Sequence, residues 1–213
     1  MSAGIPCVCG ECVLCLIYRR LCNQAGDPPA KLSIELIPSP NWGANLRKLL
    51  TRSAWDKLRF FVYERAGGVC EVCGDKGTNQ GRRHDLEAHE IWEYNDNALI
   101  QRLAGVVALC PRCHAVKHMG RTVSVSERGA QEARAHLASV NGWDEKITKP
   151  YEWAAFFIHE WRSRHVWSID MISIMDFAEG VEAPLTYRDI DKMVAKWRGN
   201  KRHIYKERLD TEE

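Results

Sequence analysis

The chain has 213 residues, of which 45% are hydrophobic, and its formal net charge is +2 at pH 7. This is enough apolar material to bury a core, so the composition excludes a wholly disordered chain and allows one ordinary domain or a small module with additions. A charge this close to neutral gives no argument for a nucleic-acid partner, and any basic surface must come from local clustering.

The first forty residues are expected to form a cysteine-rich arm outside the core. Prolines interrupt the chain at residues 28–29 and again at 38–40. The cysteines of this stretch could bind a second zinc ion or an iron–sulfur cluster, or they could belong to a flexible tail without a fixed metal. They are Cys7, Cys9, Cys12, Cys15 and Cys22.

The nine cysteines also bear on the compartment. An odd number, gathered in tight clusters, is typical of metal ligation and not of a disulfide framework, so a reducing, cytoplasmic setting is expected. The N-terminus lacks a basic leader, and the apolar run at residues 13–18 is too short to cross a bilayer. We therefore expect neither export nor a membrane partner.

A helix is expected to begin at Ser53. Ser53 and Asp56 have the spacing of a capping box, and Gly67 and Gly68 are typical of a helix end. This helix should lead directly into the next motif and pack against it. Its apolar residues recur with helical spacing at Trp55, Leu58, Phe61 and Val62.

Two Cys-x2-Cys pairs, a few dozen residues apart, form the most specific motif in the chain. Each pair can form a tight turn, and together they supply the four thiolates of a closed tetrahedral zinc site. We therefore expect one structural Zn²⁺ ion and a module that unfolds without it. Its ligands would be Cys70, Cys73, Cys110 and Cys113.

Between the two pairs the sequence predicts a polar loop and a β-hairpin. The first strand, residues 86–92, alternates apolar and polar side chains, so Glu87 and His89 should project to one side. The second strand, residues 103–109, should carry a bulge at Gly105.

Three histidines near the cysteine pairs form a second constellation. His114 and His118 are four residues apart, so a short helix would place both imidazoles on one face. His89 lies on the predicted strand beside the carboxylate of Glu90. Such a group is harder and more open than four thiolates, and it suits a divalent ion that contacts phosphate oxygens.

The C-terminal half is expected to be mainly helical. One helix should begin at Ser126 and stop at Gly142, and another should begin at Pro150. The last segment, residues 192–208, is basic, and it could neutralise phosphates or be a solvated helix. The aromatic residues of the Pro150 helix are expected in the core, not as a platform for bases; they are Trp153, Phe156, Phe157 and Trp161.

The order of these motifs resembles the HNH endonuclease family, the zinc-bearing branch of the ββα-metal nucleases. A cysteine pair, a strand with a histidine motif, an apolar run and Leu-Cys-x2-Cys-His-x3-His follow one another within residues 58–121. The resemblance implies that His89 and His114 bind the catalytic metal, with His118 as a possible third ligand. It places Glu90 at the position of the general base.

Two positions depart from the family pattern. Glu90 stands where a histidine is usual, and a carboxylate is a weak base unless burial raises its pKa toward neutrality. Gly105 stands where the family has its asparagine. Basic side chains around the motif are expected to contact nucleic acid. They are Arg82, Arg83, Lys117 and Arg121.

The sequence thus predicts an α+β fold, with a small zinc-stabilised ββα-metal core. The expected parts are the arm at residues 1–40, the nuclease core with its lead-in helix at 41–121, and the helical region with its basic last helix at 122–213. No feature of the sequence indicates an oligomeric state.

The expected function is that of a metal-dependent HNH endonuclease acting on DNA, with RNA left open as a substrate. The resemblance implies 5′-phosphate and 3′-hydroxyl ends, and Mg²⁺ or another divalent ion beside the structural Zn²⁺. The alternative, favoured by Glu90 and Gly105, is an inactive zinc-stabilised module that binds nucleic acid or protein. A further alternative is a different hydrolase that uses the same imidazoles.

Overall fold

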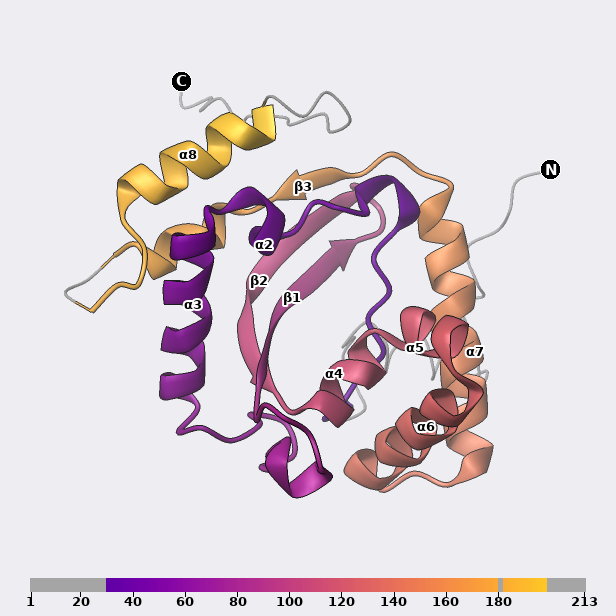
Figure 1. Ribbon diagram of the computed structural model, residues 1–213. Helices are drawn as coiled ribbons and strands as arrows, with labels where there is room; N and C mark the ends of the chain where they lie inside the picture. The colour runs from indigo at the N-terminus through magenta and orange to yellow at the C-terminus, as the bar shows by residue number, and fades with distance from the viewer. Residues whose placement is uncertain (1–29, 180–181, 199–213) are drawn as a thin grey trace.

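The computed structural model describes residues 30–179 and 182–198. The five cysteines of the predicted arm and the end of the basic segment, residues 199–208, lie outside the described residues. The fold is α+β, with helices around a three-stranded sheet (Figure 1). The strands are β1 (Glu87–Asn95), β2 (Ile100–Leu109) and β3 (Ser168–Asp170). The helices are α2 (Leu46–Leu49), α3 (Arg52–Arg65), α4 (Pro111–Lys117), α5 (Met119–Val125), α6 (Glu127–Asn141), α7 (Glu145–Ser163) and α8 (Tyr187–Arg198).

β1 and β2 form the predicted antiparallel hairpin, and both strands are longer than expected. The register shifts between Ile91 and Trp92, because β2 carries one extra residue next to Gly105. Gly105 has a φ of +157°, which a residue with a side chain rarely adopts, so the predicted bulge is confirmed. β3 adds to β2 in parallel and was not predicted, since three residues show too little periodicity.

α3 lies beside the sheet and leads into the first cysteine pair (Figure 1). Thr51 caps it, because its side chain accepts a hydrogen bond from a backbone N–H one turn later (3.2 Å). The predicted cap at Ser53 is therefore wrong. Leu58 and Val62 are fully buried, and the positive φ of the glycines at 67–68 confirms the predicted end.

Residues 32–38 pack against the core, which corrects the prediction that this stretch is part of an arm. Leu32 is fully buried and Ile34 is 6% exposed. The backbone N–H of Glu35 donates to the carbonyl of Lys117 at the end of α4 (3.1 Å). Leu32 and Ile34 alternate with polar residues, the pattern of a half-buried extended segment, and the nearby prolines do not prevent this packing.

α6 and α7 lie on the same side of the molecule as α4 and α5, whereas α8 lies near α2 (Figure 1). α6 has Ser126 as its N-cap and Gly142 in the left-handed conformation at its end, both as predicted. α7 begins earlier than predicted, because Asp144 caps it and Pro150 lies inside the helix. Within the described ranges, no helix is both long enough and apolar enough to span a bilayer.

The aromatic face of α7 is not all core, which corrects the prediction for two of its residues. Trp153 is 55% exposed and Phe157 is 41% exposed, and their stacked rings have centroids 5.4 Å apart. The face of α7 that packs on the protein instead contains Tyr151, Ile158 and two alanines. Small residues on that face permit close approach, and helical periodicity alone could not distinguish the two faces.

Candidate metal centres

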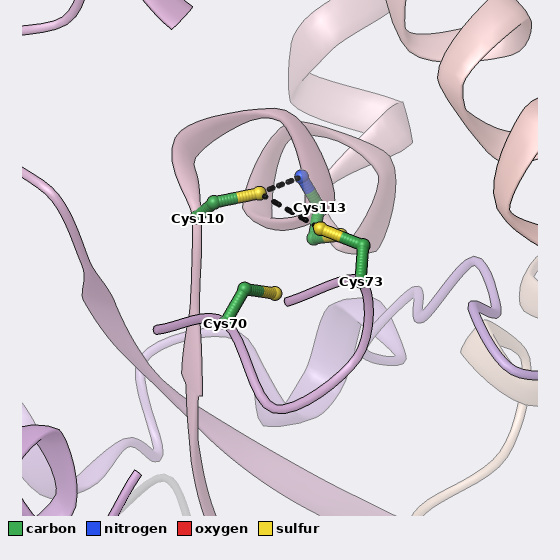
Figure 2. Close-up of side chains that lie close together, drawn as sticks. All are labelled: Cys70, Cys73, Cys110 and Cys113. Atoms are coloured by element: carbon green, nitrogen blue, oxygen red, sulfur yellow. Dashed lines mark hydrogen bonds between the residues drawn. The ribbon is translucent and has the colours of Figure 1, made fainter. Parts of the chain in front are cut away.

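The four predicted thiols converge on one point (Figure 2). Cys70 and Cys73 lie on the turn after α3, whereas Cys110 and Cys113 lie at the start of α4. The Sγ atoms of Cys73 and Cys110 are 3.6 Å apart. A tetrahedral zinc ion with Zn–S bonds of about 2.3 Å separates its sulfurs by about 3.8 Å. These four residues, the thiol cluster, therefore fit zinc.

Local backbone geometry holds each cysteine pair. Gly74 has a φ of +75°, and its N–H donates to the carbonyl of Cys70 (2.9 Å), which closes the first turn. Cys110 is the N-cap of α4, and Pro111 occupies the first turn, where its missing N–H costs no hydrogen bond. Burial raises the pKa of the Cys73 thiol to about 12, so a thiolate at this position needs a cation beside it.

One histidine that the sequence analysis did not identify contacts the thiol cluster. Nε2 of His136, on α6, lies 3.2 Å from Sγ of Cys113. Burial lowers the pKa of His136, which favours a neutral imidazole that can donate an N–H to a thiolate. No motif spacing connects the two residues, so only the packing of α6 on α4 reveals the contact.

The three predicted histidines also come together. Nitrogen atoms of His89, His114 and His118 lie within 4.8 Å of one another. His89 comes from β1, whereas His114 lies in α4 and His118 caps its C-terminus, so the four-residue spacing places both on one face as expected. Zinc with Zn–N bonds of about 2.1 Å separates its ligands by about 3.4 Å, which small side-chain rotations can reach. We call these residues the imidazole cluster.

The chemistry of the imidazole cluster favours a transition-metal ion. Burial and the neighbouring His114 lower the pKa of His118 to about 3, and burial also lowers the pKa of His89. These neutral rings are the form that binds metal. Three nitrogen donors suit Zn²⁺ and related ions, whereas Mg²⁺ prefers oxygen ligands and fits this site less well.

Glu87 is the first of two carboxylates that contact the imidazole cluster. It shares a face of β1 with His89, as predicted, and it forms an ion pair with Nδ1 of His114. Its other oxygen lies 2.7 Å from Nε2 of His84, an exposed side chain that is thereby a partner of Glu87. Burial opposes ionisation, but the contact with His114 lowers the pKa of Glu87 to about 2.

Glu35 is the second carboxylate, and the sequence analysis did not identify it. Its Oε2 lies 3.2 Å from Nε2 of His89 and 3.2 Å from Nζ of Lys117. Its Oε1 accepts the backbone N–H of Trp92 (2.7 Å). Burial would raise its pKa, but Lys117 and His89 lower the pKa of Glu35 to about 2. Glu35 therefore brings a negative charge to the cluster.

Glu90 lies on the opposite side of β1 from His89, as adjacent residues of a strand do. Its Oε1 accepts the N–H of Leu46 at the start of α2 (2.5 Å), and its Oε2 accepts the indole N–H of Trp92 (3.3 Å). This corrects the expectation that the carboxylate of the second constellation is Glu90. Burial does raise the pKa of Glu90 to about 7, the condition under which a carboxylate becomes an effective base.

The predicted nucleic-acid contacts divide into exposed and buried residues. Arg82 and Arg83 are exposed on the loop before β1, and Arg121 is exposed on α5. Lys117 is 9% exposed, and Nζ donates to Ser33 (2.9 Å) beside its ion pair with Glu35. Lys117 therefore belongs to the surroundings of the imidazole cluster, which corrects its assignment to the phosphate-binding surface.

Comparisons of the chain with protein-family models, with curated proteins and with solved structures find no match. What the protein does must therefore be inferred from the two clusters. They meet on α4, where Cys113 and His114 are adjacent residues.

Proposed function

We propose that the protein is a metal-dependent phosphodiesterase that cleaves nucleic acid, primarily DNA, in the manner of HNH endonucleases. The observation that carries this proposal is the convergence of three imidazoles, those of His89, His114 and His118. The thiol cluster lies beside them, and α4 with its two caps supplies ligands to both clusters. A closed thiol site next to an open imidazole site fits one ion that stabilises the fold and another that takes part in hydrolysis.

The residues around the imidazole cluster have separate roles in this proposal. The three rings would hold a divalent ion, which when bound stabilises negative charge on the leaving 3′ oxygen. Glu87 orients His114 by accepting a hydrogen bond at Nδ1. Arg82, Arg83 and Arg121 would bind phosphates on either side of the scissile bond.

The resemblance to HNH endonucleases would make Glu90 the acceptor of the proton from the attacking water, but its carboxylate lies on the side of β1 away from the imidazole cluster. Its pKa of about 7 suits this role at neutral pH. Its position on the far side of β1 favours the second candidate function, an inactive zinc-stabilised module that binds nucleic acid or protein. A cleavage assay distinguishes the two.

The assay measures nicking of supercoiled plasmid by the zinc-loaded chain after addition of Mn²⁺, Zn²⁺ or Mg²⁺. The parent should nick, His89→Ala should not, and His165→Ala, a histidine outside the cluster, should match the parent. DNA ligase should reseal the nicks if the ends are 5′-phosphate and 3′-hydroxyl. A folded parent that binds labelled DNA but never nicks it would establish the binding module instead.

Glu90→Gln tests the proton acceptor in the same assay. Loss of a general base costs about 10²- to 10⁴-fold in rate, so Glu90→Gln would be nearly inactive if Glu90 were the base, whereas the position of its carboxylate predicts cleavage close to that of the parent. If Glu90→Gln cleaves like the parent, Glu90 is not the base.

A further inference from the structure

Glu35 reaches the imidazole cluster from a stretch of chain outside the cysteine and histidine motifs. The backbone N–H of Trp92 fixes Oε1 at 2.7 Å, and this leaves Oε2 to face His89 and Lys117, each at 3.2 Å. The Glu35 side chain is only 9% exposed and that of Lys117 only 11%. Water therefore competes little for either oxygen.

The hydrogen bond between Glu35 and His89 decides which nitrogen of the imidazole can bind metal. A carboxylate accepts hydrogen bonds and donates none, so Nε2 of His89 must carry the hydrogen. Nδ1 then keeps its lone pair. Carboxylates that hold a ligand histidine in one tautomer in this way also raise the basicity of the ring.

We propose that Glu35 is a positioning residue of the imidazole cluster, which holds His89 as the Nε2–H tautomer and leaves Nδ1 to bind the ion. This inference rests on the proposed function only in assuming that a divalent ion occupies the cluster. Glu35 also offsets the ammonium of Lys117, a cation that would otherwise oppose a second cation nearby. The segment that contains Glu35 is thus part of the metal centre.

Glu35→Gln reverses the polarity of this contact with almost no change in shape. The N–H of Trp92 needs an acceptor, so the amide oxygen takes the place of Oε1 and the NH₂ group faces His89, while Lys117 keeps Ser33 as its acceptor. That NH₂ group donates to Nε2 and drives His89 to the Nδ1–H tautomer, which cannot bind an ion through Nδ1. Loss of such an outer contact typically weakens metal binding about 10- to 100-fold.

The matched control is Glu152→Gln. Glu152 is likewise a buried carboxylate, 8% exposed, but its partner is Arg134 of α6, outside the cluster. Both variants and the parent are first loaded with one zinc per chain at the thiol cluster and then titrated with Co²⁺, whose visible absorption reports histidine ligation. Glu35→Gln should bind Co²⁺ at least about 10-fold more weakly, and Glu152→Gln should bind within about 2-fold of the parent.

A second measurement reads the tautomer without any ion in the cluster. Long-range ¹H–¹⁵N spectra of the imidazoles should show His89 as the Nε2–H tautomer in the parent and as the Nδ1–H tautomer in Glu35→Gln. An Nδ1–H tautomer in the parent overturns the inference, as does unchanged Co²⁺ affinity in Glu35→Gln or an equal loss in Glu152→Gln. If the parent binds no Co²⁺ at all, the proposed function fails because the imidazole cluster holds no ion. The spectra still test whether Glu35 sets the tautomer of His89.

Discussion

The thiol cluster and the imidazole cluster share α4 but differ in exposure. Cys110 and Cys113 are fully buried, whereas His114 and His118 are partly exposed. Four donors, three of them buried, fill a tetrahedral ion and leave no place for a substrate, while three donors, two of them partly exposed, leave one. One short helix can therefore supply ligands to a closed site and to an open one, which the proposed function assigns to a structural ion and a catalytic ion.

The partners around the two clusters are opposite in polarity. The thiol cluster receives a donor, the imidazole of His136, next to Cys113. The imidazole cluster receives acceptors, the carboxylates of Glu35 and Glu87. Metal-bound thiolates carry excess negative charge and metal-bound imidazoles carry N–H groups, so each set of partners complements its cluster. The predictions below separate the two sites by this difference.

Removal of one thiol should have the largest effect. Cys110→Ser takes away a zinc ligand but leaves a residue that can cap α4, so zinc should be lost and cooperative unfolding should disappear for want of the ion alone. Thermal unfolding followed by circular dichroism, with zinc content by mass spectrometry, measures both. Val116→Ala, a buried truncation on α4, should cost only about 1 to 3 kcal/mol and keep the zinc. A Cys110→Ser chain that unfolds cooperatively without zinc would refute a structural role for the ion.

Removal of one imidazole should abolish activity and leave the fold intact. His118→Ala should weaken binding of the second ion by more than the roughly 10- to 100-fold that loss of an outer contact costs, because one of three direct donors is lost, while zinc stays in the thiol cluster. Calorimetric titration of the zinc-loaded chain with Mn²⁺ or Co²⁺ measures the affinity, with His165→Ala as the control. If His118→Ala instead releases the zinc, the two clusters are not independent.

Both clusters could be predicted because their ligands follow local rules. The thiols occur in pairs of fixed spacing, two of the imidazoles are four apart on a helix, and Glu87 and His89 alternate on a strand. The same alternation places Glu90 on the other face, because adjacent residues of a strand point to opposite sides, so its position next to His89 in the sequence does not bring its carboxylate to the cluster.

The outer partners could not be predicted, because they depend on tertiary contacts between distant residues. Glu35 is 54 positions from His89, and His136 is 23 positions from Cys113. Neither distance corresponds to a helical or strand repeat, so no periodicity in the sequence indicates these pairs. The short strand β3 was missed for the same reason, since it forms only by pairing with β2.

Replacement of Glu90 by a neutral side chain should give the next largest effect, a gain of stability that depends on pH. The pKa of Glu90 is about 7 in the folded chain and near 4.5 when unfolded, so its contribution to stability is fully present below pH 4.5 and is lost as the pH rises to about 7. Glu90→Gln avoids this loss. Its urea unfolding free energy should equal or fall below that of the parent at pH 4.5 and exceed it by roughly 1 to 3 kcal/mol at pH 8.

Other groups titrate in the same pH range, but both chains contain them, so their contributions cancel when the two unfolding free energies are subtracted. Glu93→Gln, on the exposed face of β1, should show no such pH dependence. If the difference in unfolding free energy between Glu90→Gln and the parent stays constant from pH 4.5 to pH 8, the pKa of Glu90 is not raised in the folded chain.

The smallest effect is expected at the partner of the thiol cluster. His136→Ala removes the N–H group next to Cys113, so a chromogenic chelator should extract zinc about 10-fold more readily, while zinc stoichiometry stays at one. Gln131→Ala, an exposed position on the same helix, should not change extraction. If His136→Ala retains zinc as firmly as the parent, the four sulfurs need no outer donor. Outer partners would then matter only at the imidazole cluster, where three donors leave the ion less constrained.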